Sequence, residues 1–177
     1  MTQRNPVRVA VNGFGVIGKR VTDAVLLQDD MQLVGVCDVA SDLRLHTLAA
    51  KGIALYAASD EAYRAMSEAG LPVSGSLDAL LDQADLVVDC TPKSVGAVNV
   101  ERYRARGIKF IVHGGEKHEV TGHSFVAESS FSSAVGREST RVVSCNTTSI
   151  VRTLTALKGA GLLKRARGTL LRRATDP

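Results

Sequence analysis

The strongest evidence for the fold lies in residues 7–20, which read Val-Arg-Val-Ala-Val-Asn-Gly-Phe-Gly-Val-Ile-Gly-Lys-Arg. Its first five residues are mostly apolar and β-branched, which predicts a short buried strand. The last residues of the stretch are expected to begin a helix that ends near Gln28. Gly13, Gly15 and Gly18 lie between this strand and this helix, with the spacing that is typical of a turn that binds a dinucleotide.

Each glycine of this turn has a separate expected task. Gly13 permits the tight turn, Gly15 lets a pyrophosphate approach the backbone, and Gly18 lets the helix pack closely on the sheet. The free N–H groups and the dipole at the start of the helix favour an anion there. The alternative is a glycine-rich turn that holds no ligand.

The strand that follows supports the interpretation of the turn as a dinucleotide-binding site. Gln32–Cys37 is strand-like and leads into Asp38, about 20 residues after Gly18, where a Rossmann fold places the acid that binds the ribose hydroxyls. A carboxylate at this position favours NAD, whereas the 2′-phosphate of NADP is repelled by it. Arg44 can soften that repulsion, so NADP stays possible.

The alternation of strands and helices continues along the chain. We expect a helix capped by Ser41 that ends near Ala50, and a helix capped by Ser59 that ends at Gly70. Further elements are expected at residues 77–83 (helix), 86–90 (strand), 96–106 (helix), 109–112 (strand), 141–144 (strand), 147–158 (helix) and 169–173 (strand). This pattern predicts an α/β fold with a Rossmann-like, doubly wound parallel sheet.

Loops after the strands are expected to carry the ligand, because open parallel sheets bind at the carboxyl ends of their strands. Thr91 follows one strand and Gly115 follows another. Both are candidates to line the nucleotide channel, although either residue can also serve the turn alone.

Composition limits the function classes. The 177 residues are 45% hydrophobic and carry a net charge of +4. The basic residues are mostly scattered and aromatic residues are few, which argues against nucleic-acid binding. No apolar run approaches the ~18 residues of a membrane span, and the start of the sequence shows no signal peptide. We therefore expect a cytoplasmic protein without a membrane or nucleic-acid partner.

Cys145 lies between a predicted strand and a predicted helix. A thiolate at a helix start is favoured by the dipole and by the free N–H groups. Asn146 and the N–H groups around Thr147 are candidates to hold an oxyanion. Attack on a carbonyl, next to a nicotinamide that accepts hydride, is the chemistry that this arrangement suggests. Cys37 and Cys90 end sheet strands and are expected to be structural.

The remaining titratable residues indicate little. Three widely spaced cysteines form no metal-ligand pair and no disulfide framework, and we expect no metal. His113, His118 and His123 are expected at the surface or in hydrogen bonds rather than as a catalytic base.

Several blocks together resemble the archaeal-type (type II) phosphorylating glyceraldehyde-3-phosphate dehydrogenases. They are Val-Asn-Gly-Phe-Gly-Val-Ile-Gly-Lys-Arg-Val, Gln-Asp-Asp-Met, Asp-Cys-Thr-Pro, Gly-Gly-Glu-Lys-His-Glu, Arg-Val-Val-Ser-Cys-Asn-Thr-Thr and Arg-Arg-Ala-Thr-Asp-Pro. Ser-Cys-Asn-Thr-Thr is the most specific of them. The resemblance covers essentially the whole chain.

The resemblance implies a nucleophile and a substrate site. Cys145 would form a thiohemiacetal with glyceraldehyde-3-phosphate and then a thioester, which inorganic phosphate releases. Ser144 and Asn146 would border the substrate.

The resemblance also implies cofactor contacts and an assembly. Val16, Ile17 and Gly115 would touch the NAD or NADP, and Arg173 would contact the cofactor or an adjacent anion. The family implies a homo-oligomer, a tetramer.

Two departures from the family pattern matter. Chains of this family are longer, and their second half carries paired histidines that include the general base, whereas no histidine follows His123 here. We therefore interpret residues 1–144 as a dinucleotide-binding domain and 145–177 as the start of a truncated catalytic domain, with little activity alone. The family commonly has Lys-Thr where this chain has Asp38 and Val39.

Two alternatives remain open. Aspartate-semialdehyde dehydrogenase shares the architecture and a cysteine followed by asparagine, but not the Ser-Cys-Asn-Thr-Thr block. A catalytically silent nucleotide-binding module is the alternative from another functional class.

Overall fold

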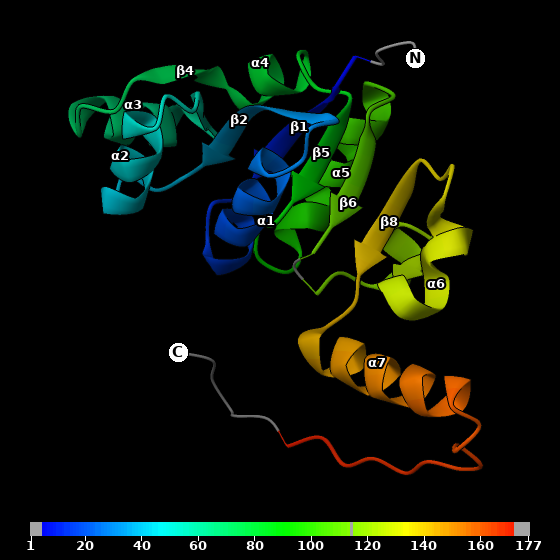
Figure 1. Cartoon of the computed structure of the whole chain (residues 1–177). Helices are drawn as coiled ribbons and strands as arrows, with labels where there is room; N and C mark the ends of the chain where they lie inside the picture. The colour runs from blue at the N-terminus through cyan, green and yellow to red at the C-terminus, as the bar shows by residue number, and fades with distance from the viewer. Residues whose placement is uncertain (1–4, 114, 172–177) are drawn as a thin grey trace.

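The computed structural model describes residues 5–113 and 115–171. Within these residues the chain forms one sheet of eight parallel strands, in the order β4-β3-β2-β1-β5-β6-β8-β7 (Figure 1). The strands are β1 (Val7–Asn12), β2 (Met31–Asp38), β3 (Leu55–Ala57), β4 (Val73–Ser76), β5 (Leu86–Asp89), β6 (Lys109–Val112), β7 (Ser124–Phe125) and β8 (Ser139–Val142). The predicted doubly wound α/β fold is confirmed.

Helices cover both faces of this sheet. They are α1 (Val16–Leu26), α2 (Leu43–Ala50), α3 (Asp60–Glu68), α4 (Leu77–Leu81), α5 (Val95–Ala105), α6 (Ala127–Ala134) and α7 (Cys145–Gly159), with one 3₁₀ turn, η1 (His118–Val120). Successive residues of a strand point to opposite faces, and β1 shows this directly. Ala10 belongs to the apolar cluster that includes Leu80 and Tyr103 of α4 and α5. Val11 belongs to the cluster that includes Leu45 and Leu48 of α2.

The strand order reverses between β1 and β5. β1 pairs with β2 on one side and with β5 on the other, so the chain leaves the carboxyl ends of these two strands in opposite directions. A crevice forms at such a reversal in open α/β sheets, and ligands bind there. The glycine turn follows β1 and Thr91 follows β5, so both expected ligand loops border this crevice.

Three short strands were not predicted. β3, β4 and β7 have three, four and two residues. Such runs are too short to show a period, and only their pairing to a longer neighbour makes them strands.

Some predicted boundaries were wrong. The cap of α2 is Asp42, whose side chain accepts a hydrogen bond from the backbone N–H of Arg44 at 3.0 Å, rather than Ser41. β8 ends at Val142, and α7 begins at Cys145 with Ser144 as its cap. Residues 169–171 are irregular instead of forming a strand, and Arg173 lies outside the described residues.

Candidate functional site: a nucleotide cleft and a cysteine groove

At two of the three glycines of the turn there is no space for a side chain. Gly13 has φ +93, and a Cβ built there would lie 2.9 Å from the carbonyl carbon of Cys90. A Cβ on Gly18 would lie 1.8 Å from the carbonyl oxygen of Gly13. The tight turn and the close packing predicted for Gly13 and Gly18 are therefore confirmed. Nothing lies within 4 Å of a Cβ on Gly15, so its predicted contact with a pyrophosphate has open space.

The start of α1 is free of protein caps. Gly15 is its N-cap residue, no side chain of the described residues caps it, and its first turn holds no acid. Val16 and Ile17 are 70% and 45% exposed. An uncapped helix start with free N–H groups attracts anions, so a phosphate group fits here.

Asp38 ties the glycine turn to the end of β2. Its Oδ2 accepts the backbone N–H of Phe14 at 2.5 Å. Its Oδ1 accepts the N–H groups of Val39 and Ala40 at 2.7 and 2.9 Å. A carboxylate has about four acceptor positions, so the backbone leaves room for about one ribose hydroxyl instead of the two that we expected.

The glycine turn and the loop after β5 enclose a cleft of about 590 Å³. It brings together Gly13, Gly15, Asp38 and Thr91 from the predicted set. Val16, Ile17, Gly18 and Gly115 do not line this cleft. Gly115 lies in the loop after β6, with φ +77.

A buried polar network lies beneath the cleft. The Asp89 carboxylate is 1% exposed and accepts the hydroxyl of Tyr103 at 2.6 Å and the amide of Asn99 at 3.0 Å. It also accepts the backbone N–H and the hydroxyl of Thr91 at 2.9 and 2.5 Å. These bonds fix the loop that borders the cleft, a role that the sequence did not indicate.

Asn12 offers one more polar atom at the cleft. Its side-chain nitrogen donates to Tyr103 at 2.9 Å. Its buried Oδ1 has no hydrogen-bond partner among the described residues, and Asn12 lines the cleft. Buried acceptors without partners are rare, so this atom is an unusual feature of the wall of the cleft.

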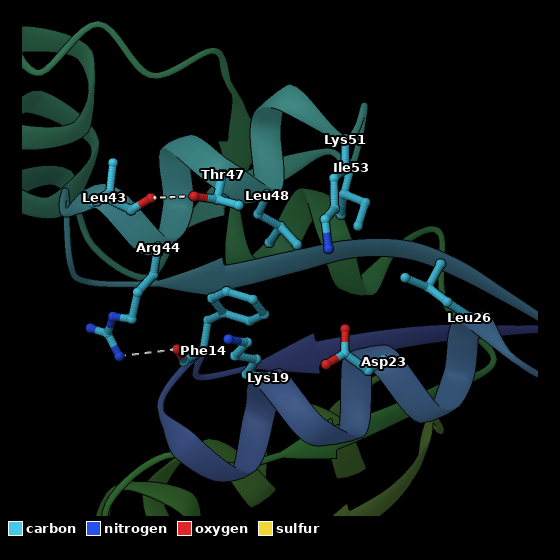
Figure 2. Close-up of a pocket in the computed structure, with 10 residues that line it drawn as sticks. All are labelled: Phe14, Lys19, Asp23, Leu26, Leu43, Arg44, Thr47, Leu48, Lys51 and Ile53. Atoms are coloured by element: carbon cyan, nitrogen blue, oxygen red, sulfur yellow. Dashed lines mark hydrogen bonds between the residues drawn. The ribbon is translucent and has the colours of Figure 1, made fainter.

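Arg44 lies between the glycine turn and α2. Figure 2 shows its side chain near the Phe14 carbonyl oxygen, at one end of a hollow of about 230 Å³ between α1 and α2. Its guanidinium donates to that oxygen at 3.3 Å and to Asp42 at 2.9 and 2.5 Å. The charge of Arg44 is therefore balanced mainly by Asp42 rather than by Asp38.

Cys145 is the first residue of α7 and is exposed. The hydroxyl of Ser144 accepts the backbone N–H of Thr147 at 3.2 Å and thereby caps the helix. The position of the thiol at a helix start is confirmed. Because the Thr147 N–H is already bonded, Asn146 is the remaining predicted partner for an oxyanion.

A groove of about 720 Å³ lies between Cys145 and α1, the helix that follows the glycine turn. Ile17, Arg20 and Val21 of α1 form one wall, and Cys145, Thr148 and Arg152 of α7 belong to the other. Arg152 pairs with Glu128 at 2.7 Å. Sequence reasoning missed both arginines, although Arg152 lies two turns after Cys145 on the same helix face.

The other two thiols differ from Cys145. Cys37 is fully buried, and burial raises its pKa strongly. Burial, with a smaller contribution from Asp89, raises the pKa of Cys90 to about 12. Neither thiol forms a thiolate readily, which supports the structural role predicted for them.

The three histidines singled out in the sequence all have identifiable surroundings, and Nδ1 of the exposed His118 lies 3.0 Å from the Ser124 hydroxyl. His123 is buried, with Nδ1 2.7 Å from the Thr140 hydroxyl and Nε2 3.0 Å from that of Ser133. Its predicted hydrogen-bonding role is confirmed. His113 lines the Cys145 groove, and burial lowers its pKa against the opposing effect of Asp89.

None of the helices in the described residues combines the length and apolarity needed to cross a membrane. Within residues 5–113 and 115–171, no three His, Cys, Asp or Glu side chains gather in a way that could hold a metal ion.

The chain is similar in sequence to a protein family and to named relatives. The family model described as dihydrodipicolinate reductase, N-terminus, matches residues 7–146. A glyceraldehyde-3-phosphate dehydrogenase of Methanothermus fervidus is 45% identical over 169 residues, which are 96% of this chain and 50% of that protein. One of Methanococcoides burtonii is 47% identical over 171 residues, 97% of this chain and 51% of that protein. The chain thus spans about half the length of these curated relatives.

A solved structure, GenD2 from gentamicin A biosynthesis in complex with NAD, is more distant. It is 19% identical, with a TM-score of 0.43, over 64% of this chain and 28% of that one. Similarity at this level supports no inference about function.

Proposed function

This chain belongs to the family described as dihydrodipicolinate reductase, N-terminus, and because its relatives are named glyceraldehyde-3-phosphate dehydrogenase, we propose that it is the nucleotide-binding half of a phosphorylating enzyme of that name. The relatives that carry this name are 45% and 47% identical to nearly the whole chain. The proposed cofactor is NAD or NADP, in the cleft between the glycine turn and Thr91.

One observation carries the proposal. The exposed thiol of Cys145 and Ile17 of the glycine helix line the same groove. A nucleophile and a nicotinamide must meet at one carbon atom for hydride transfer to follow nucleophilic attack. The groove brings Cys145 beside α1, whose start borders the proposed cofactor cleft, and this neighbourhood supports the proposed order of steps.

The proposed chemistry begins at the sulfur of Cys145. Its thiolate attacks the aldehyde carbon of glyceraldehyde-3-phosphate and forms a thiohemiacetal, while Asn146 donates to the oxyanion. A dinucleotide held in the cleft would supply the acceptor for the hydride that leaves this carbon, and Cys145 would then carry a thioester. Inorganic phosphate then attacks the thioester, the C–S bond breaks, and 1,3-bisphosphoglycerate leaves.

Arg20 and Arg152 supply positive charge on opposite walls of this groove. An aldehyde that carries a phosphate group needs such charge, because a guanidinium binds phosphate oxygens through two parallel hydrogen bonds. We assign them to anion binding beside Cys145. Arg20→Gln and Arg152→Gln are then expected to weaken substrate binding while NAD binding changes little.

A second candidate is a nucleotide-binding module that does not turn over aldehyde. The nucleotide cleft is formed without Cys145, which favours it. Under either proposal the chain binds dinucleotide. They differ in whether Cys145 reacts with the aldehyde.

Two measurements on the wild-type chain and on Cys145→Ser separate these candidates. Calorimetric titration with NAD and NADP tests the cleft, and the expected result is binding to both proteins. Mass spectrometry after incubation with glyceraldehyde-3-phosphate and NAD tests for an acyl adduct, expected on the wild-type chain alone. Failure to bind either dinucleotide refutes both candidates, whereas binding without an adduct refutes the reaction of Cys145 in this chain and favours the second candidate.

We expect these residues to turn over aldehyde slowly or not at all, because the histidine that serves as general base in the family has no counterpart in them. General-base catalysis is worth ~10² to 10⁴ in rate. A homotetramer is proposed from the resemblance to glyceraldehyde-3-phosphate dehydrogenases, and the cytoplasmic location expected from the sequence stays a proposal. Light scattering on the purified protein tests the assembly.

A further inference from the structure

Glu116 is a buried acid that the proposed chemistry does not use. It is 4% exposed, and none of the ion pairs in residues 5–113 and 115–171 involves it. It follows Gly115 in the loop after β6. A buried carboxylate needs hydrogen-bond donors to offset its lost hydration, so its contacts indicate what it does.

The side chain of Glu116 bonds to the start of α5. Its Oε1 accepts the backbone N–H of Ser94 at 2.7 Å. Ser94 is the N-cap residue of α5, has no side-chain cap bond and adopts φ +75. It is the one residue other than glycine with positive φ in the described part of the chain. Such a conformation costs about 1–2 kcal/mol, so the bond to Glu116 helps to hold a strained residue.

The same side chain packs against the first turn of α5. A Cβ built on Gly96 would lie 3.2 Å from Oε1 of Glu116 and 3.4 Å from Oδ1 of Asp89. Both buried carboxylates therefore approach Gly96, which leaves space for them. Asp89 in turn holds Thr91, and Thr91 and Val95 line the nucleotide cleft.

The backbone of Glu116 is fixed from the other side. Its carbonyl oxygen accepts the guanidinium of Arg141, on β8, at 2.8 Å. Glu116 thus joins three segments, the start of α5, the loop after β6 and strand β8. The first two follow β5 and β6, at the carboxyl edge of the sheet.

We propose that Glu116 is a positioning residue of the dinucleotide site. By binding the Ser94 N–H, it holds the segment 91–95 and the loop that carries Gly115 in the arrangement that receives the nicotinamide half of the cofactor. This inference rests on the proposed dinucleotide function. It assigns to Glu116 no contact with the cofactor itself.

The bond can be tested without any cofactor. Amide hydrogen exchange, followed by NMR, is measured at Ser94 in the wild-type chain, Glu116→Gln and Glu116→Ala. Glutamine retains an oxygen acceptor at this position and alanine does not, so protection is expected in the first two proteins and faster exchange in the third. Equal protection in Glu116→Ala overturns the proposal whether or not the cleft binds NAD.

The consequence for the site is tested by calorimetric titration with NAD. Glu116→Ala is expected to bind at least about tenfold more weakly than the wild-type chain, a factor that corresponds to ~1.4 kcal/mol. Glu116→Gln is expected to stay within about threefold, because a neutral acceptor preserves much of the bond. Glu119→Ala removes an exposed acid three residues further along and serves as the matched control, with unchanged binding.

A folding defect in Glu116→Ala would not block the test. Ser94→Gly removes the strain, since glycine adopts positive φ readily, so Ser94→Gly with Glu116→Ala is then compared with Ser94→Gly alone. The same tenfold loss is expected. Unchanged affinity, or a loss in Glu116→Gln as large as in Glu116→Ala, overturns the proposal. If the wild-type chain binds no dinucleotide, the proposed function fails as well, and the exchange result still decides whether the Ser94 bond exists.

Discussion

The charge of Asp38 is expected to set the preference for NAD over NADP. The carboxylate lines the nucleotide cleft, and the nearest guanidinium, that of Arg44, is bound to Asp42 at 2.9 and 2.5 Å. Asp38 therefore keeps most of its negative charge toward the ligand. The 2′-phosphate of NADP carries about −1.5 to −2 charges by analogy with a phosphorylated side chain.

The size of the effect follows from Coulomb's law. Two unit charges 4 Å apart repel by about 4 kcal/mol at an effective dielectric constant of 20. Solvent and Arg44 reduce this repulsion. If ~1.4 kcal/mol remains, NAD binds about tenfold more tightly than NADP.

Asp38→Asn tests this reasoning. Asparagine keeps an oxygen that can accept the Val39 and Ala40 N–H groups, but its amide nitrogen cannot accept the N–H of Phe14. The lost bond weakens both cofactors alike, by about 1.5–3 kcal/mol for a bond to a charged group. The ratio of the two dissociation constants removes this common loss, so it reports the charge alone.

The assay is calorimetric titration of both cofactors at equal ionic strength. We expect the ratio to move at least about tenfold toward NADP in Asp38→Asn. Asp29→Asn changes the same charge in the turn before β2, at the opposite edge of the sheet, and should leave the ratio unchanged. Equal affinities of NAD and NADP for the wild-type chain, or the same ratio in Asp38→Asn, would refute the argument.

Four further outcomes are expected. Cys145 should be the first of the three thiols to react with iodoacetamide between pH 5 and 9, as read by mass spectrometry, and earlier labelling of either other thiol contradicts its assignment. Gly18→Ala should lower the free energy of unfolding by about 3 kcal/mol or more in a urea titration, because its Cβ meets backbone; a loss below 1 kcal/mol would show that the turn can shift. Gly15→Ala should unfold within about 0.5 kcal/mol of the wild type and yet bind NAD more weakly, whereas equal affinity would remove Gly15 from the pyrophosphate site. Ser94→Gly should raise the free energy of unfolding by about 0.5 kcal/mol, the relief of strain less the entropy of glycine, and a decrease would mean that Ser94 is not strained.

The parts of the fold that the sequence predicts well are those with a local cause. The glycine turn is one, since Gly13 and Gly18 are required by contacts within the turn and with the adjacent strand end. The junction of strand and helix near Cys145 is another, although Ser144, predicted as a strand residue, is in fact the helix cap and the helix begins two residues earlier than predicted. Propensity and capping act over a few residues and can be read from them.

The features that sequence reasoning missed depend on contacts between distant residues. β3 is a strand because Leu55 pairs with Val36 of β2. Asp89 and Glu116 are buried only because β5, β6 and α5 meet at Gly96. Their local sequences contain no signal for this, since a buried acid and an exposed acid look alike in a chain.

The exposed helix α7 has a mechanical consequence. None of its residues is buried; Ser144, which caps its first turn, follows β8 closely in the chain, and further along the helix Arg152 forms an exposed ion pair with Glu128 of α6. The helix has 15 residues and therefore acts as a lever about 21 Å long at a rise of 1.5 Å per residue. A tilt of about 10° about its first turn would move Gly159 by about 4 Å at that length and Cys145 hardly at all. Because Cys145 lies at the end about which the helix tilts, such a tilt leaves the distance between its thiol and the glycine turn nearly constant.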